Sequence, residues 1–243
     1  MNRADAHPID PPRPTHFYPF FPVTLLLLAM MLVAASITGA YAEGLSRPAL
    51  ELVGFPPRTF AAGELYRIVT SAFATHGPRV LSGGLLMVGL SVGLAEWTVG
   101  SLGALLGFWL IHTLSLLVVY SGGAALEAIV PVMDAATATR IPDVGPSAGY
   151  FGCLGLALGV LSRSARIGGR FRAELPIRPE QGATWVACVV LGWLVLDLTG
   201  IASPGPALAT EVGADWAHLV AFSMGVGAGR WMGRRATRTR ASS

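Results

Sequence analysis

Of the 243 residues in the chain, 53% are hydrophobic and only 13% are charged. Soluble domains average about 25% charged residues, so this composition excludes a protein that water surrounds on all sides. The 17 basic residues are all arginines, and the net charge is +3. Arginine clusters would suit nucleic acid, but their positions along the chain point to a membrane surface instead.

Six apolar segments follow one another along the chain, each close to the ~20 residues that a helix needs to cross a bilayer. They cover residues 19–42, 79–99, 102–121, 145–163, 182–200 and 214–232. Inside the hydrocarbon the backbone must satisfy its own hydrogen bonds, which helices do. The sequence therefore predicts an all-α membrane protein. Its parts are a polar tail over 1–18, a six-helix membrane domain over 19–232 and a basic tail over 233–243.

The arginines predict how these segments are oriented. Arg3 and Arg13 precede the first segment. Five more lie between the fourth and fifth segments and five at the end of the chain, at positions 163, 166, 170, 172, 178, 230, 234, 235, 238 and 240. Six spans put all three stretches on one side, and the positive-inside rule makes that side the cytoplasm. We expect a multi-pass protein of the cell membrane, with both termini cytoplasmic and its basic tails beside membrane lipid.

Two further features bear on the class of protein. AYAEG at 40–44 resembles a signal-peptidase site, but the apolar run before it is longer than the ~7–15 residues of a signal core. We therefore expect this run to be a retained helix. Cys153 and Cys188 both lie inside apolar segments, so a disulfide framework is not expected.

The stretch DVGPSAGYFG, residues 143–152, places Ser147 at the outer end of the fourth segment. Serine is a preferred helix N-cap because its oxygen accepts an orphan backbone N–H, and this role alone would explain Ser147. A nucleophilic serine needs in addition a base within hydrogen-bond reach. Of the five histidines, only His218 lies near the outer end of a segment, level with Ser147.

Small residues predict that the fourth and sixth helices approach closely. His218 shares a helical face with Ala221, Gly225 and Gly229. The fourth segment has its own stripe of glycines, at positions 145, 149, 152, 155 and 159. Such stripes let transmembrane helices pack closely. Ser147 points away from its stripe, and Phe151 lies one turn below it. We therefore expect Ser147 and His218 to meet as a pair, because an ionisable group inside a membrane is costly and marks a functional site.

With these features the chain resembles the rhomboid family of intramembrane serine proteases over roughly residues 60–230. GPSA at 145–148 stands where the family has Gly-x-Ser-Gly, and AHLVAFSMG at 217–225 resembles its Ala-His-x-Gly-Gly-x-x-x-Gly. YRIVTSAF, with Tyr66 and Arg67, is similar to the Trp-Arg element of the family's first outer loop. His76 and GLAEWTVG, which contains Glu96 and Gly100, match the two ends of its second helix. These pieces occur in the family's order.

The resemblance implies a six-helix bundle that cleaves transmembrane segments of other membrane proteins and uses no metal or cofactor. Ser147 would attack the scissile carbonyl, and His218 would take its proton and pass it to the leaving amine. The backbone N–H of Ser147 would bind the oxyanion. Four more residues would support the site: Gly145, Ala148, Phe151 and His76. The substrate, the cleavage site and the oligomeric state do not follow from the sequence.

The chain departs from the family's pattern where oxyanion donors are expected. The family's second helix carries a His and an Asn at these places. Counting back from Glu96 puts Val80 and Gly84 there, and counting forward from His76 puts Leu81 and Leu85 there. None of the four carries a donor, and the loss of one oxyanion donor typically costs ~10²–10³ in rate. Ala148, Val220 and Ala221 also replace glycines of the family.

Two functions remain open after this comparison. The first is an intramembrane serine endopeptidase, and the second is a catalytically weak or inactive rhomboid-like protein that binds transmembrane segments. A transporter is disfavoured, since no pair of interrupted helices is evident. Asp197 in the fifth segment could orient His218 or bind local backbone. His112 in the third segment is expected to be a packing histidine rather than a proton relay.

Overall fold

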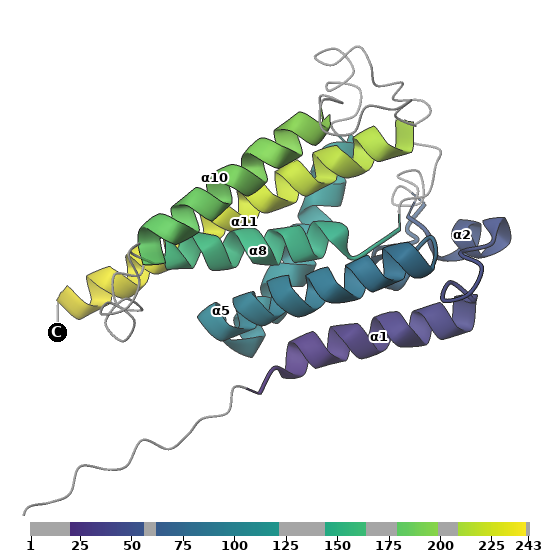
Figure 1. Cartoon of the computed structure of the whole chain (residues 1–243), viewed down its shortest axis with the longest axis horizontal. Helices are drawn as coiled ribbons and strands as arrows, with labels where there is room; N and C mark the ends of the chain where they lie inside the picture. Colours follow the sequence, from purple (N-terminus) through teal and green to yellow (C-terminus); the bar gives the residue numbers. More distant parts are fainter. Residues whose placement is uncertain (1–19, 56–61, 122–143, 164–178, 199–208, 242–243) are drawn as a thin grey trace, which may run out of the picture.

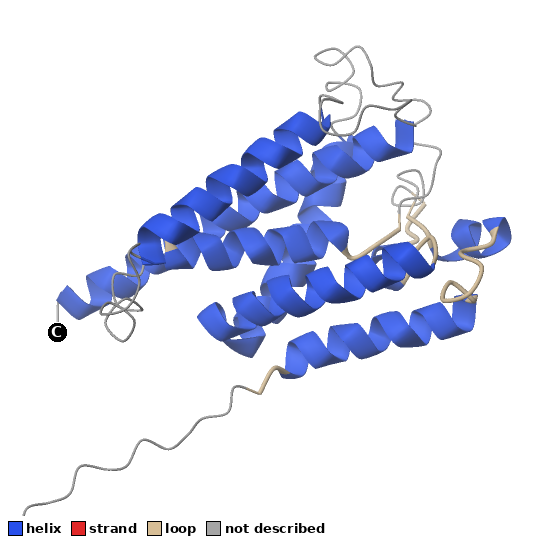
Figure 2. Ribbon diagram, viewed as in Figure 1, coloured by secondary structure: helices blue, strands red, loops and turns tan. Residues whose placement is uncertain are grey.

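The computed structural model describes residues 20–55, 62–121, 144–163, 179–198 and 209–241. All regular elements in these residues are α-helices (Figure 2). They are α1 (Pro22–Thr38), α2 (Arg47–Val53), α4 (Tyr66–Phe73), α5 (Pro78–Ser121), α8 (Ser147–Leu161), α10 (Pro179–Leu198) and α11 (Ala209–Ala241). Figure 1 shows α1 beside α5 at one side of the molecule and α10 beside α11 at the other, with α8 between them. The predicted all-α class is confirmed.

Each of the six predicted apolar segments coincides with a helix or with half of one. The second and third segments form the single helix α5, which is broken at Gly100. The φ of Gly100 is 78° and its ψ is 167°, a conformation that glycine adopts without strain. Beyond this break the second half of α5 passes behind α8 and α11 (Figure 1). The chain therefore forms two helical stretches where the sequence predicts two helices.

By length and composition, one described helix is able to cross a membrane. Residues Pro78–Val119 of α5 contain a window with a mean hydropathy of 2.1. Gly100 divides α5 into stretches of which each is near the ~20 residues of one span. Three other apolar helices are shorter, at Pro22–Thr38, Ser147–Leu161 and Glu180–Leu196. Membrane association is thus indicated by α5.

The structure adds detail at two places. The helix α11 continues to Ala241, so it includes most of the basic tail expected over 233–243. The stretch before α5 contains the short helices α2 and α4. The polar tail over 1–18 lies outside the described residues. Ser46 caps α2 by accepting a hydrogen bond from the N–H of Ala49 at 3.4 Å, and Pro48 occupies its first turn.

A buried carboxylate from α5 closes the start of α1. Glu96 is 5% exposed and accepts hydrogen bonds from the backbone N–H groups of Val23 and Thr24, at 3.0 and 2.9 Å. The hydroxyl of Thr24 donates a third bond to Glu96, at 2.8 Å. The first N–H groups of a helix have no partner within it, and a negative charge there also complements the helix dipole. Glu96 therefore fixes α1 against the inner part of α5.

We predict that Glu96→Gln lowers the free energy of unfolding by about 2–3 kcal/mol, because the amide removes the charge and turns an NH₂ group toward a backbone donor. Thr24→Val is the matched control, since it removes one of the three bonds and should cost about 1 kcal/mol. Chemical unfolding of the purified protein in detergent micelles measures both. A Glu96→Gln protein as stable as the native chain would contradict this role for the carboxylate.

The glycines of α8 and α11 bring the two backbones together. A Cβ on Gly225 would lie 2.2 Å from the carbonyl oxygen of Gly152, and a Cβ on Gly155 would lie 2.3 Å from that of Phe222. Further along, a Cβ on Gly159 would lie 3.0 Å from the Cα of Gly229. The predicted close approach of these helices is confirmed over this part of the stripe.

One glycine of the predicted stripe has a different neighbour. A Cβ on Gly149 would lie 2.4 Å from the ring of Phe108 in the second half of α5. Gly152 serves both interfaces, because its Cβ would lie 2.5 Å from the side chain of Ile111. The small residues of α8 therefore allow close packing on two sides, against α5 and against α11. This double packing holds the first turn of α8, which begins at Ser147, in a defined position.

Gly229 and Gly227 make a matched pair that tests this packing. A Cβ on Gly229 would lie 2.2 Å from the carbonyl oxygen of Leu156 and 2.8 Å from the N atom of Val160, whereas a Cβ on Gly227 meets nothing within 4 Å. We predict that Gly229→Ala lowers the free energy of unfolding by about 1–3 kcal/mol. Gly227→Ala should instead be neutral or add up to about 1 kcal/mol. Equal effects of the two changes in unfolding measurements would contradict the close contact.

Candidate active site

Ser147 is the first residue of α8, and the residue in the N-cap position is Pro146. No side-chain hydrogen bond caps this helix, so the structure does not use Ser147 as the N-cap that the sequence allowed. Gly145 has a φ of 132°, in the region that favours glycine, and its N–H donates to the carbonyl oxygen of Ser71 in α4 at 2.8 Å. The turn before Ser147 is thus fixed by glycine geometry and by a hydrogen bond to α4.

His218 lies in α11 against the side chain of Phe151 from α8. The two ring centroids are 4.8 Å apart, and the ring planes are inclined by 39°. Ser147 precedes Phe151 by four residues, so both lie on the same side of α8, one turn apart. Phe151, which the resemblance implies as a supporting residue of the site, thus contacts the imidazole of His218.

The register of α8 and α11 sets the depth of the two candidate catalytic residues. Gly159 and Gly229 face each other where these parallel helices cross. Ser147 lies twelve residues before Gly159, and His218 lies eleven residues before Gly229. At a rise of ~1.5 Å per residue, the two positions are therefore level to within about one residue. The α8–α11 interface thus places Ser147 and His218 at the same end and depth of the bundle.

Asp215 is an acidic neighbour of His218 that the sequence interpretation missed. Its Oδ1 is 3.9 Å from the Nδ1 of His218, within ion-pair range but too long for a direct hydrogen bond. Both side chains are largely buried, at 16% exposure for His218 and 21% for Asp215. The spacing of three residues on one helix was the available signal. Asp197, the acid considered from the sequence, lies in α10, and its side chain is outside the described part of the structure.

The other predicted supporting residues take different places. Ala148 is 3% exposed and packs in a cluster with Phe151, Ala221 and Phe222, so these alanines keep α8 and α11 close. His76 lies in the loop before α5 and is exposed. The contact recorded there is of its backbone, whose carbonyl oxygen lies 2.6 Å from the Cβ position of Gly44. The described contacts do not join His76 to Ser147.

Helices α2 and α4 support the turn that carries Gly145. The guanidinium of Arg67 donates to the carbonyl oxygens of Glu51, Leu52 and Gly54, at 2.6, 2.9 and 3.1 Å, and so closes the end of α2. Thr70 adds a bond from its hydroxyl to the carbonyl oxygen of Val53 at 2.8 Å. Ser71, which accepts the bond from Gly145, is the next residue of α4. The Tyr66-Arg67 motif therefore organises the region that anchors the Ser147 turn.

Backbone donors are available around Ser147, and one side-chain position faces them. The first N–H groups of a helix have no intrahelical partner, and here they belong to Ser147, Ala148 and Gly149. A Cβ on Gly84 would lie 3.7 Å from the Cγ of Pro146 and 3.0 Å from the Cε of Met31. Position 84 is thus adjacent to the start of α8.

The other candidate donor positions are placed less favourably. Val80 is 50% exposed, and Leu81 is buried in the core that α1 and α5 share. Leu85 is partly buried and packs against the same core. Counting back from Glu96 thus gives Gly84, whose Cβ position contacts the serine turn at Pro146.

His112 is buried deeply without the hydrogen bonds of a satisfied packing histidine. It is 2% exposed, and neither ring nitrogen has a hydrogen-bond partner in the described structure. Its ring stacks on Phe108 at a centroid distance of 6.0 Å and meets the edge of Trp109 at 6.1 Å. The expected packing role is therefore supported by ring contacts alone.

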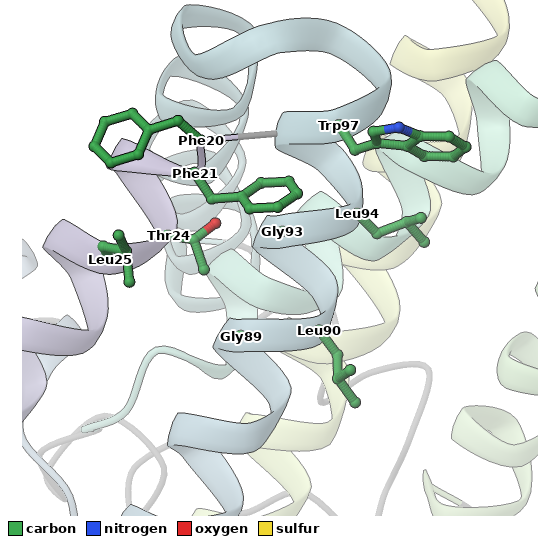
Figure 3. A pocket seen from close by; sticks show the side chains of 9 residues that line it. All are labelled: Phe20, Phe21, Thr24, Leu25, Gly89, Leu90, Gly93, Leu94 and Trp97. Carbon is green, nitrogen blue, oxygen red and sulfur yellow. The ribbon is translucent and has the colours of Figure 1, made fainter. Parts of the chain in front are cut away.

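A groove of about 480 Å³ lies away from this site, between α1 and the first half of α5 (Figure 3). Its lining is mostly apolar and includes Phe21, Leu90, Leu94 and Trp97. Its one hydroxyl, of Thr24, donates to Glu96, and the described lining contains no acid or base. In the described residues no group of three His, Cys, Asp or Glu side chains is placed to hold a metal ion.

Models of known protein families give no match to this chain, and no curated protein matches it.

Proposed function

We propose that the protein is an intramembrane serine endopeptidase in which Ser147 is the nucleophile and His218 the general base. The observation that carries this proposal is the ring contact between Phe151 and His218 across the α8–α11 interface, at 4.8 Å. It puts the imidazole beside the face of α8 on which Ser147 lies one turn earlier. A serine with a positioned histidine is the minimal set for acyl transfer.

In the proposed mechanism, Ser147 Oγ attacks the scissile carbonyl carbon while His218 accepts the hydroxyl proton. His218 then donates this proton to the leaving amine, and water hydrolyses the acyl-enzyme by the same steps. Nδ1 of His218 is the nitrogen near Asp215, so Nε2 is the one that would face the serine. Asp215 would stabilise the imidazolium, and the backbone N–H groups at the start of α8 would bind the oxyanion.

The particular kind of peptidase we propose is rhomboid-like. Six helical passes, formed by α1, the two halves of α5, α8, α10 and α11, would span the membrane, with the dyad near the outer surface. The substrates would be transmembrane segments of other membrane proteins. This is supported by the order of the sequence motifs, by the Gly100 break and by the close α8–α11 packing.

Active-site labelling tests the proposal directly. The purified full-length protein in detergent should react covalently with a fluorophosphonate at one site, Ser147, and both Ser147→Ala and His218→Ala should prevent labelling. Ser162→Ala is the matched control, because Ser162 lies at the opposite end of α8 and bonds its own helix at Gly159. Equal labelling of the native and Ser147→Ala proteins would overturn the assignment of the nucleophile.

The proposed topology makes a separate prediction. With six spans and this arginine distribution, both termini and the 164–181 loop would lie in the cytoplasm. A reporter that is active only outside the cytoplasm, fused after Ser243, should therefore stay silent. The same reporter fused within the 122–143 region should be active. Signal from the Ser243 fusion would contradict the six-span arrangement.

A second candidate function is supported by the missing side-chain donors at Val80 and Gly84. A rhomboid-like protein with a weak or inactive site could still bind transmembrane segments and hold them. Fluorophosphonate labelling separates the candidates, since a protein that only binds would not react at Ser147. Binding of a model transmembrane peptide without labelling or cleavage would favour this second function.

A further inference from the structure

A second polar feature lies between α10 and α11, away from the proposed dyad. A groove of about 290 Å³ opens between these helices. Its apolar walls include Leu191, Phe222 and Val226, and its polar side chains include Thr184, Cys188 and Arg230. Arg230 follows His218 by twelve residues in α11, so at ~1.5 Å per residue the two lie about 18 Å apart along the helix. The groove is thus at the opposite end of α11 from the dyad.

Arg230 has no protein partner to balance its charge among the described residues. Its Nε is buried and makes no hydrogen bond there, and no ion pair to Arg230 is present in that part of the chain. Glu180, the acid nearest to the groove in sequence, uses its backbone carbonyl to accept a bond from Thr184. A buried guanidinium donor without an acceptor is costly, so this position favours an anionic ligand.

The surroundings of Arg230 add positive charge at the same end of the bundle. A Cβ on Gly233 would lie 2.9 Å from the Cβ of Arg163, which places Arg163 beside this part of α11. Arg163 and Arg234 are both exposed there. Basic pockets between transmembrane helices bind anionic lipid head groups. A free phosphate ion would use the charge but not the apolar walls of the groove, whereas a phospholipid uses both.

We propose that the α10–α11 groove binds one anionic phospholipid of the membrane, whose phosphate accepts hydrogen bonds from Arg230 while an acyl chain lies along Leu191 and Val226. Arg suits this role because its planar guanidinium forms paired hydrogen bonds with phosphate oxygens. The bound lipid fills the space between α10 and α11 and neutralises Arg230. It thereby stabilises the position of α10 against the rest of the bundle.

Cys188 provides a direct readout of this groove. The chain has two cysteines, of which Cys153 is buried while Cys188 is exposed and lines the groove. The rate at which a fluorescent maleimide modifies Cys188 is measured on the full-length protein in neutral detergent, with phosphatidylglycerol or phosphatidylcholine of the same chain length added. We expect phosphatidylglycerol to slow the reaction at a roughly tenfold lower concentration than phosphatidylcholine, because one charged hydrogen bond contributes about that factor.

Three variants test whether the charge of Arg230 and the space of the groove are responsible for the lipid protection of Cys188. Arg230→Gln should remove the preference for phosphatidylglycerol, whereas Arg79→Gln, which removes an exposed charge at the Ser147 end, should keep it. Ala187→Phe fills the groove and should abolish protection by either lipid while leaving Arg230 in place. Inorganic phosphate should give no protection. Thermal unfolding verifies that each variant is folded.

Several results would overturn the proposal. Equal protection of Cys188 by the two lipids would show that the groove binds acyl chains without selecting an anionic head group. If inorganic phosphate alone slowed the modification of Cys188, the ligand of the groove would be a free anion and not a lipid. If the folded Arg230→Gln protein kept the preference for phosphatidylglycerol, Arg230 would not be part of the lipid site. Should Arg230→Gln fail to fold, persistence of the preference in the Ala187→Phe protein would overturn the proposal in its place.

Discussion

Ser147→Ala and His218→Ala are each expected to abolish cleavage of a model transmembrane substrate, with a loss of at least about 10⁴-fold in kcat. The serine supplies the attacking oxygen, and the histidine removes its proton, so either change stops the same step. The double variant should then be no worse than either single one, because residues that act as one unit are non-additive. Cleavage assays on the three variants in liposomes measure this directly.

The control for this result has to separate chemistry from folding. Ser162→Ala changes a serine of the same helix and should retain full activity, and all variants should accumulate in the membrane to the native level. Ala217, which precedes His218, and Ala148, which follows Ser147, are 1% and 3% exposed, so larger changes beside the dyad would disturb packing. Full cleavage by Ser147→Ala would leave the serine without a chemical role. Multiplicative losses in the double variant would place the two residues in separate functions.

The features of the fold that could be predicted are those that depend on local pattern. Apolar length located the helices, and the conformational freedom of Gly100 accounts for the break between the two halves of α5. The glycine spacing of α8 and α11 predicted their contact, because small residues at three- and four-residue intervals form one face of a helix. The glycine spacing does not say which helix packs against each glycine. The packing of Gly149 on Phe108 was therefore not predicted.

Contacts between residues far apart in the sequence were beyond prediction. Glu96 is 72 residues from Thr24, and no local pattern says that its carboxylate will close the start of α1. The same holds for the bond from Gly145 to Ser71, which fixes the turn before Ser147. Asp215 is different, since its spacing of three residues from His218 was visible in the sequence. Asp197, the acid considered from the sequence, belongs to a different helix, α10.

The structure distinguishes the surroundings of the positions at which the two alignments put the missing oxyanion donors. Both registers were possible from the sequence, because Glu96 and His76 gave answers that differ by one residue. One residue changes the direction of a helical side chain by about 100°. In the structure Gly84 faces the turn of Pro146, whereas Val80 is half exposed. A donor added at position 84 would therefore start beside the serine turn, whereas one added at position 80 would start from a half-exposed part of α5.

Gly84→Asn is accordingly expected to raise the rate of cleavage by roughly 10²-fold at best, the lower end of what one oxyanion donor contributes. An asparagine amide at this position would reach from beside Pro146 toward the carbonyl oxygen of a bound substrate. Because the added bond forms with the developing negative charge, it should raise kcat and leave KM nearly unchanged. Steady-state cleavage of a model transmembrane substrate separates these two constants.

The added side chain requires a small shift of Met31. Its Cβ would lie 3.0 Å from the Cε of this buried methionine, which is the flexible end of the side chain and has to move by a few tenths of an ångström. Gly84→Ala tests this accommodation without adding a donor, and it should leave kcat unchanged. Gly83→Asn is the second control, because a Cβ on Gly83 meets nothing within 4 Å and position 83 is exposed. An equal gain from Gly83→Asn would point to a general effect of the amide.

The outcome of Gly84→Asn also discriminates between the two proposed functions. A gain that disappears when Ser147→Ala is added would place the chemistry on Ser147, and the native protein would then be a slow protease limited by its oxyanion site. A folded Gly84→Asn protein that neither cleaves nor reacts with a fluorophosphonate would favour the protein that only binds transmembrane segments. In that case the packing of Phe151 against His218 would serve the stability of the α8–α11 interface alone.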